Sequence, residues 1–285
     1  MRVTVRKRAR VQGWTLAGRI VLYAFLLLGA SLTLVPMLWL VAATLKGPDD
    51  LFHYLFFAPL SRWTLSSFAD LFKKVDFFRY LVNSTFIASA IVVTQLFFSS
   101  LAGFALAKYD FRGKKLIMVV MLATMLIPGQ VVMAPLYELI FRMGLVDTYP
   151  GLIIPGMVSV FGIFLFRQSI QQVPDELLQA ARIDGCTEFR TYWSVVMPVS
   201  RPMVGAFCLI SFMGAWNSFL WPQIILHNRD LFTLPIALSQ MIGVYNQEYG
   251  MLMAGTLVSV LPVVILFLIL QKEFVAGLTA GAVKG

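Results

Sequence analysis

Six apolar stretches, each close to the length needed to cross a lipid bilayer, constrain the fold of this chain more than any other feature. They cover Ile20–Ala43, Leu81–Ala107, Leu116–Leu136, Pro150–Phe166, Met203–Leu226 and Met251–Leu270, and none contains Asp, Glu, Lys or His. A transmembrane helix needs about 20 apolar residues, and backbone groups in lipid must find hydrogen bonds within the protein. The sequence therefore predicts an all-α polytopic membrane protein with six transmembrane helices.

The composition excludes several other classes of protein. Of the 285 residues, 59% are hydrophobic and 13% are charged, whereas a soluble domain has about 45–50% apolar and about 25% charged residues. This excludes an ordinary water-soluble enzyme, a disordered tail and a disulfide-stapled secreted module. Cys186 falls in a loop and Cys208 in an apolar stretch, so we expect reduced structural thiols.

The basic residues indicate the orientation of the chain in the membrane. With six spans, one side would carry 16 of the 23 Lys and Arg residues. These 16 are Arg2, Arg6, Lys7, Arg8, Arg10, Arg19, Lys108, Arg112, Lys114, Lys115, Arg167, Arg182, Arg190, Arg201, Lys272 and Lys284. Cytoplasmic loops carry the excess of Lys and Arg, so both termini are predicted to be cytoplasmic. The net charge of +9 then reflects membrane topology, and no nucleic-acid partner is expected.

The same pattern divides the chain into segments. We expect a basic cytoplasmic N-terminus over residues 1–19, a membrane domain over 20–270 and a cytoplasmic tail over 271–285. An external loop would cover 44–80, and the longest cytoplasmic loop would cover 167–202. A cleaved signal peptide is the alternative for the N-terminus, but the apolar run of 24 residues from Ile20 to Ala43 exceeds the usual core of about 7–15 residues.

Motifs of soluble catalytic proteins are missing from the sequence. It holds no GxxxxGK[ST] phosphate loop, no HExxH and no GxSxG. His53 and His227 lie outside the spans at unrelated positions, so we predict no metal site. A polytopic membrane enzyme would need a cluster of carboxylates or histidines at one face. A self-sufficient secondary transporter would need ionisable groups within its spans, whereas Glu138 and Arg167 lie just outside them. Both remain as alternatives, with weaker support.

The long cytoplasmic loop is predicted to contain two short helices. The first has Pro174 at its first position, Asp175 and Glu176 at its positive N-terminal end, and Gly185 as its stop. The second is expected to start after Thr187 as N-cap and to stop near Pro198.

Residues of this loop carry a family resemblance. The string from Ala180 to Gly185, Ala-Ala-Arg-Ile-Asp-Gly, followed by Met197-Pro198, resembles the "EAA" loop of ABC-importer permease subunits. Gln179 stands where the family usually has Glu, although Glu176 lies one turn earlier. Further similar segments are Leu45–Phe52, Phe104–Lys114, Ile127–Gln130, Ala215–Pro222 and Phe274–Gly285, the last resembling the carbohydrate (maltose-transporter) group. The resemblance extends over about residues 15–285.

The resemblance implies a type I ABC-importer permease fold in a bacterial or archaeal cell membrane. Such a subunit forms half of a channel with a second, homologous permease, receives substrate from an extracytoplasmic solute-binding protein, and is driven by two ATPase subunits. No cofactor is then expected on this chain, because ATP and Mg²⁺ bind the partner ATPase. The residues implied to couple the chain to that ATPase are Glu176, Ala180, Ala181, Arg182, Asp184, Gly185 and Pro198.

Trp216 and Asn217 are candidates for substrate contact, because an aromatic face and an amide are the pair that suits sugar recognition. An interfacial tryptophan and an asparagine between helices would look the same in sequence. A sugar, a polyol and a glycerol phosphate all remain open as substrates.

Prolines are frequent in the apolar stretches: Pro36, Pro128, Pro135, Pro155, Pro222 and Pro262. They indicate either kinked helices around a cavity or the ordinary tolerance of membrane helices for proline.

Overall fold

The computed structural model describes residues 16–244 and 249–280, and within these ranges the chain is helical with no strand. The basic residues Arg2, Arg6, Lys7, Arg8 and Arg10, and the end of the tail with Lys284, lie outside the described residues. Three helices are long and apolar enough to cross a membrane: α1 (Leu16–Thr44), α3 (Phe77–Lys108) and α14 (Tyr249–Ala280). They contain the first, second and sixth predicted spans.

Three further pairs of helices pass the same length and composition test only when each bent pair is taken as one span, which gives up to six. One pair combines α4 (Lys114–Thr124) with the segment formed by η3 (Gly129–Val132) and α5 (Met133–Arg142), bent by 94°. The span predicted over Leu116–Leu136 is therefore not one straight helix but a broken one. The chain leaves the helix before Pro128, since proline disfavours helical geometry in the residue that precedes it.

The fourth predicted stretch is also interrupted. It comprises α6 (Tyr149–Ile153), η4 (Ile154–Gly156) and α7 (Val160–Ile170), with a bend of 43°. Pro155 lies in η4 at this break. The predicted spans are thus interrupted near Pro128 and Pro155, whereas Pro36 and Pro262 lie inside the uninterrupted helices α1 and α14.

The fifth predicted stretch, Met203–Leu226, is likewise two helices. They are α11 (Arg201–Trp216) and α12 (Leu220–Ile225), so a single helix over that range is wrong. The bent pair that includes α11 reaches back along the chain instead, joining Glu188–Val199 to Arg201–Trp216 at 83°.

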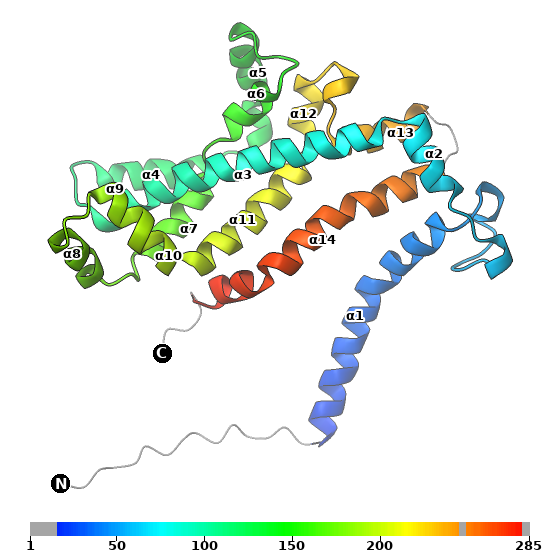
Figure 1. Cartoon of the computed structure of the whole chain (residues 1–285), viewed down its shortest axis with the longest axis horizontal. Coiled ribbons are helices and arrows are strands. Elements are labelled where there is room, and N and C mark those ends of the chain that lie inside the picture. Colours follow the sequence, from blue (N-terminus) through cyan, green and yellow to red (C-terminus); the bar gives the residue numbers. More distant parts are fainter. Residues whose placement is uncertain (1–15, 245–248, 281–285) are drawn as a thin grey trace.

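The core forms around α3, which lies along α7 and α11, while α11 lies along α14 (Figure 1). Close packing depends on small residues at the crossings. A Cβ on Gly103 of α3 would lie 2.7 Å from the Cβ of Phe166 on α7, and one on Gly162 would lie 2.6 Å from the ring of Phe207 on α11. These crossings fix α7 and α11 against α3 and so position the loop that connects them.

One end of α3 carries the segment after α1 together with the chain between α12 and α14. This region holds η1 (Pro48–Asp50), η2 (Leu60–Arg62), α2 (Ser66–Lys74), η6 (Arg229–Leu231) and α13 (Leu234–Val244). The side chain of Asn83 on α3 donates to the carbonyl oxygens of Asp230 and Phe232 at 2.8 and 3.0 Å. The opposite end of α3 carries the loop over residues 167–202 (Figure 1).

Helix α1 differs from the other long helices, because none of its apolar window is buried within the chain. Its side chains are exposed over residues 19–38, with Phe25 72% and Leu27 68% exposed, whereas Ala42, Ala43 and Thr44 at its end are buried. It packs against α14 and otherwise diverges from the body of the molecule (Figure 1).

Candidate functional site

The first helix of the long loop is α8, which covers Asp175–Ile183. Pro174 is the residue before the helix, one position earlier than predicted, with an extended ψ of 136°. Asp175 and Glu176 lie in the first turn, where the helix dipole favours negative charge.

The predicted stop at Gly185 is confirmed, because this residue has a φ of +79°. The N–H of Cys186 donates to the carbonyl of Ala181 at 2.9 Å, and the N–H of Gly185 donates to that of Arg182 at 3.0 Å. These are the two bonds of a Schellman motif, which satisfies carbonyls at the end of the helix. Both α8 and its termination are therefore encoded locally.

Helix α8 has one face packed on the protein and one face open. Leu178 and Ala181 are buried, and Leu178 belongs to a core cluster with Phe104, Phe166 and Tyr192. The open face carries Glu176, Ala180, Arg182, Asp184 and two apolar residues, Leu177 at 42% and Ile183 at 86% exposure. Phe189, at the start of the next helix, is 57% exposed. Exposed apolar residues concentrated in one place indicate a docking surface.

Thr187 caps the second helix as predicted, since its hydroxyl oxygen accepts from the N–H of Arg190 at 3.3 Å. The helix is not regular: α9 (Glu188–Thr191) is followed by the π-helical turn η5 (Tyr192–Val196) and by α10 (Met197–Val199). It passes Pro198 and ends at Val199, so a stop near Pro198 is correct to one residue. Ser200 then turns the chain by 83° into α11.

Arg182 is held within the loop. Its Nε and Nη2 donate to the two carboxylate oxygens of Glu188 at 2.9 and 3.2 Å, a bidentate arrangement with high geometric specificity. The hydrogen bond from Arg182, followed by one from the Tyr109 hydroxyl, lowers the pKa of the Glu188 carboxyl. This joins the end of α8 to the start of α9 and to the end of α3.

A cavity of about 500 Å³ lies between α3, α7, α11 and the broken segments η3–α5 and α6–η4. Its lining is mostly apolar and includes the aromatic residues Phe161, Phe207 and Trp221. Polar contributions come from Gln95, Ser159, Ser211 and Ser218. Gln95 lies in the middle of an apolar stretch, and that position is the sequence signal that could have identified it.

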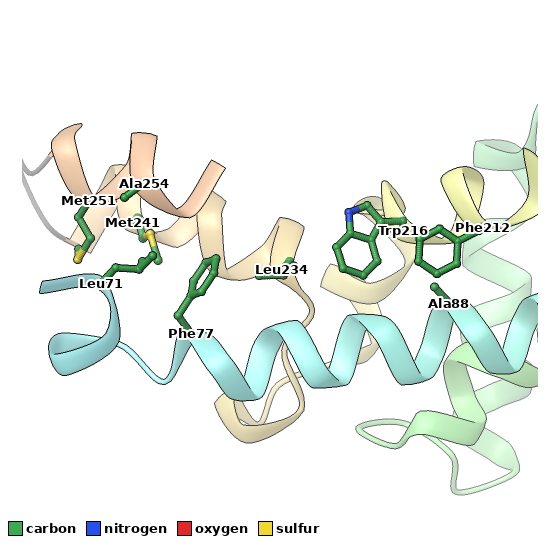
Figure 2. Close-up of a cluster of buried hydrophobic side chains, with 9 residues drawn as sticks. All are labelled: Leu71, Phe77, Ala88, Phe212, Trp216, Leu234, Met241, Met251 and Ala254. Atoms are coloured by element: carbon green, nitrogen blue, oxygen red, sulfur yellow. The ribbon is translucent and has the colours of Figure 1, made fainter. Parts of the chain in front are cut away.

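The two candidate substrate residues, Trp216 and Asn217, do not line this cavity. Trp216 is 5% exposed and stacks on Phe212 with 5.4 Å between ring centroids (Figure 2). Its Nε1 donates to the carbonyl of Ser259 at 3.2 Å. The Nδ2 of the exposed Asn217 donates to the carbonyl of Met213 at 2.9 Å, within its own helix. Their neighbours Ser218 and Trp221 do line the cavity. Trp216 is thus part of the packed core in this structure.

The described residues contain no cluster of three or more His, Cys, Asp or Glu side chains that could hold a metal ion. Cys186 and Cys208 are free thiols.

Comparisons with known proteins agree with the fold. The model of the family described as "binding-protein-dependent transport system inner membrane component" matches residues 95–278. The chain is 37% identical over 284 residues to the arabinooligosaccharides transport system permease protein AraQ of Halalkalibacterium halodurans, covering 98% of this chain and 99% of that protein. It is 33% identical over 265 residues to the lactose transport system permease protein LacG of Rhizobium radiobacter, covering 93% and 96%.

A solved structure shares the architecture. It is a chain of a bacterial ABC transporter that imports the acidic polysaccharide alginate, with a TM-score of 0.82, 22% identity, and coverage of 92% of this chain and 99% of that chain. The relatives are transport permeases, which confirms that this chain is not an enzyme. The chain therefore belongs to the binding-protein-dependent transport system inner membrane components and is a permease subunit of an ABC importer.

Proposed function

We propose that this permease forms half of a channel for carbohydrate uptake and receives the energy of ATP hydrolysis through the loop of residues 174–198. The observation that carries the proposal is the open apolar face of α8. Ile183, at 86% exposure, projects from a helix whose other face is fixed to the core by Leu178. An amphipathic helix that offers apolar side chains beyond its own core suits a groove on a second protein.

The topology we propose has six spans with both termini in the cytoplasm. The long helices and the bent pairs allow up to six spans. With the fifth span starting in α11, so that Glu188–Val199 stays in the loop, 16 of the 23 basic residues are assigned to the side of α8. Residues 1–19 and 271–285 would be cytoplasmic, 20–270 would form the membrane domain, 44–80 an external loop, and 167–202 the coupling loop. The location we propose for the protein is the cell membrane of a bacterium or archaeon, where it is a multi-pass inner-membrane component.

The coupling residues are Glu176, Ala180, Ala181, Arg182, Asp184, Gly185 and Pro198. Their roles differ in this proposal. The exposed Glu176, Ala180 and Asp184 face the ATPase, the buried Ala181 packs α8 on the core, and Gly185 ends the helix. Arg182 acts through its pair with Glu188, and Pro198 lies in α10, just before the turn into α11.

The partner we propose for α1 is the second permease subunit. No residue in the apolar window of α1 is buried by its contact with α14, so further packing of this window comes from another protein or from lipid. Two ATPase subunits would bind ATP and Mg²⁺, for which this sequence has no phosphate loop. An extracytoplasmic binding protein would deliver the substrate, which is consistent with the description of the family.

The substrate class we propose is an oligosaccharide. The relatives named for arabinooligosaccharide and lactose transport, and the alginate importer of similar fold, support this class. Of the two substrate candidates, Asn217 keeps an exposed side chain beside the cavity, so we place it, together with Ser218 and Trp221, along the transport path. Trp216 would support them from the core.

The coupling role is tested with Ile183→Lys, which puts a charge on the open face of α8. The matched control is Gln171→Lys, which adds the same charge at an exposed position after α7. Tagged subunits are expressed with their operon partners and purified. We expect Ile183→Lys to lose the co-purifying ATPase while the control keeps it; wild-type amounts of ATPase with Ile183→Lys would overturn the coupling assignment.

The substrate class is tested by uptake of radiolabelled arabinotriose, lactose and glycerol 3-phosphate into proteoliposomes that hold the complex and its binding protein. We expect uptake of a saccharide that requires ATP inside. Uptake driven by an ion gradient without ATP would instead identify a secondary transporter.

A further inference from the structure

The end of α3 contacts the first turn of α8 through Lys108. The side chain of Lys108 is 6% exposed, although lysine is usually among the most exposed residues. Its Nζ donates to the carbonyl oxygen of Val173 at 2.5 Å and to the Oδ1 of Asp175 at 2.6 Å. A cation beside a helix N-terminus opposes the helix dipole. Lys108 is nevertheless paired with Asp175 of the first turn, and its two bonds fix where α8 begins.

The next residue, Tyr109, reaches the other end of α8. Its hydroxyl donates to the carboxylate of Glu188, which in turn holds Arg182 in the last turn of α8. Burial, followed by the bond to Glu188, raises the pKa of the Tyr109 hydroxyl, which keeps it protonated as a donor. Lys108, the last residue of α3, thus contacts the start of the nine-residue helix α8, and Tyr109, the C-cap of α3, reaches the end of α8 through Glu188.

The space between these two contacts is filled by packing. Phe104 lies one turn earlier on α3, and its ring is 5.5 Å from that of Tyr109 and 5.6 Å from that of Tyr192. The hydroxyl of Tyr192 shares a buried hydrogen bond of 2.7 Å with Ser100. Leu178 of α8 is buried in the same cluster. Polar contacts at both ends and a packed centre leave α8 no free rotation about α3.

We propose that Lys108 and Tyr109 are positioning residues that clamp the two ends of α8 to α3, so that a displacement of α8 by the ATPase moves α3 with it. This rests on the proposed coupling role of α8. It goes further, because it assigns the transmission step to residues outside the coupling loop. Without these contacts, α8 still binds the ATPase but moves independently of α3. ATP hydrolysis then no longer moves the membrane helices.

The test compares ATP hydrolysis with movement of the membrane domain in the purified complex in nanodiscs. Cys186→Ser and Cys208→Ser remove the native thiols, and Ser218→Cys places a thiol in the cavity lining. The rate at which a maleimide labels this thiol is measured without nucleotide and after trapping with ATP and vanadate. The clamp variant is Lys108→Met with Tyr109→Phe. The matched control is Lys115→Met with Tyr137→Phe. It changes an exposed lysine in the first turn of α4 and a tyrosine that is stacked on Phe141.

We expect the clamp variant to retain the ATPase and hydrolyse ATP at more than half the rate of the parent, while trapping changes its labelling rate less than twofold. The control is expected to keep the full nucleotide response of the parent. Lys108→Arg, introduced in place of Lys108→Met, keeps a cation that can reach Asp175 and is expected to keep most of that response. A clamp variant with the parent's nucleotide response would overturn the proposal.

If the double variant does not assemble, Tyr109→Phe alone carries the test, because it keeps the ring on Phe104 and removes only the hydroxyl. If trapping changes the labelling rate of Tyr109→Phe by half or less of the change in the parent, the clamp is supported. A change as large as in the parent overturns it. A parent complex without a bound ATPase would contradict the proposed function instead, so the two failures are distinguishable.

Discussion

Gln95, within α3, donates a hydrogen bond from its Nε2 to the carbonyl oxygen of Gly156 at 2.7 Å. Gly156 ends η4, at the break between α6 and α7, where the helical hydrogen-bond ladder is interrupted. The Oε1 of Gln95 accepts from the hydroxyl of Ser211 on α11 at 2.7 Å. One amide thus satisfies a backbone group freed by the break and ties three helices together.

Replacement of this amide should weaken the membrane domain. We expect Gln95→Met to lower the free energy of unfolding by about 1 kcal/mol, because the Gly156 carbonyl and the Ser211 hydroxyl lose their partner. Thr94→Val is the control, since the Thr94 hydroxyl bonds only to carbonyls of its own helix. Titration with SDS, followed by tryptophan fluorescence, measures both. Equal stabilities of the two variants would contradict this role of Gln95.

The crossing of α3 and α7 should be sensitive to a single methyl group. A Cβ on Gly103 would lie 2.9 Å from the backbone nitrogen of Arg167 as well as against Phe166, and backbone cannot move aside. We expect Gly103→Ala to destabilise the protein by about 1–3 kcal/mol. Gly214→Ala meets no atom within 4 Å and should be neutral or slightly stabilising, since alanine favours helix. The same titration distinguishes them.

The end of α8 should depend on the left-handed backbone at Gly185. A Cβ there meets no neighbour, so the cost of Gly185→Ala is conformational, about 1 kcal/mol. We expect about fivefold faster amide hydrogen exchange in α8 for Gly185→Ala and a smaller increase for Gly185→Asn, because asparagine tolerates this conformation. Identical exchange for alanine and asparagine would contradict the conformational explanation.

Asp147 should make the loop contact between α5–α6 and α12–η6 dependent on pH. The backbone N–H groups of Asn228 and His227 each donate to its Oδ1 at 2.9 Å, and these bonds lower the pKa of the Asp147 carboxyl. Because the folded-state pKa is depressed, the stabilisation is complete above the unfolded pKa of about 4 and is lost as pH falls through the folded value.

Hydrogen exchange at His227 and Asn228 measures this effect, with Asp147→Asn as the comparison. The asparagine keeps an acceptor oxygen and tolerates the φ of 59° at this position, but it cannot ionise. At pH 6 the variant should exchange faster than the wild type, and the difference should shrink toward pH 2.5. A difference that is independent of pH would exclude the carboxylate charge as its cause.

The sequence predicts those features that depend on a few neighbouring residues, such as helix ends, caps and long apolar helices. The Schellman end of α8 follows from Gly185, the cap at Thr187 from its hydroxyl, and α1, α3 and α14 from their apolar length. The prolines left kinked helices open as one of two interpretations. The positions of the breaks were not predicted, because an apolar composition does not distinguish a straight helix from a broken one whose freed groups are satisfied elsewhere. The amide of Gln95 serves such a break from 61 residues away in sequence, and Lys108 meets Asp175 across 67 residues. Contacts of this kind have no local signature.

Helix α1 packs on α14, so the first described helix of the chain contacts the last one. During synthesis α1 enters the bilayer before any of its intramolecular contacts exist. Its contacts with α14 cannot form until that last helix has been synthesised. Throughout that interval the apolar surface of α1 is open to lipid and to any other membrane protein nearby. Assembly of the transporter can therefore begin before this subunit has finished folding.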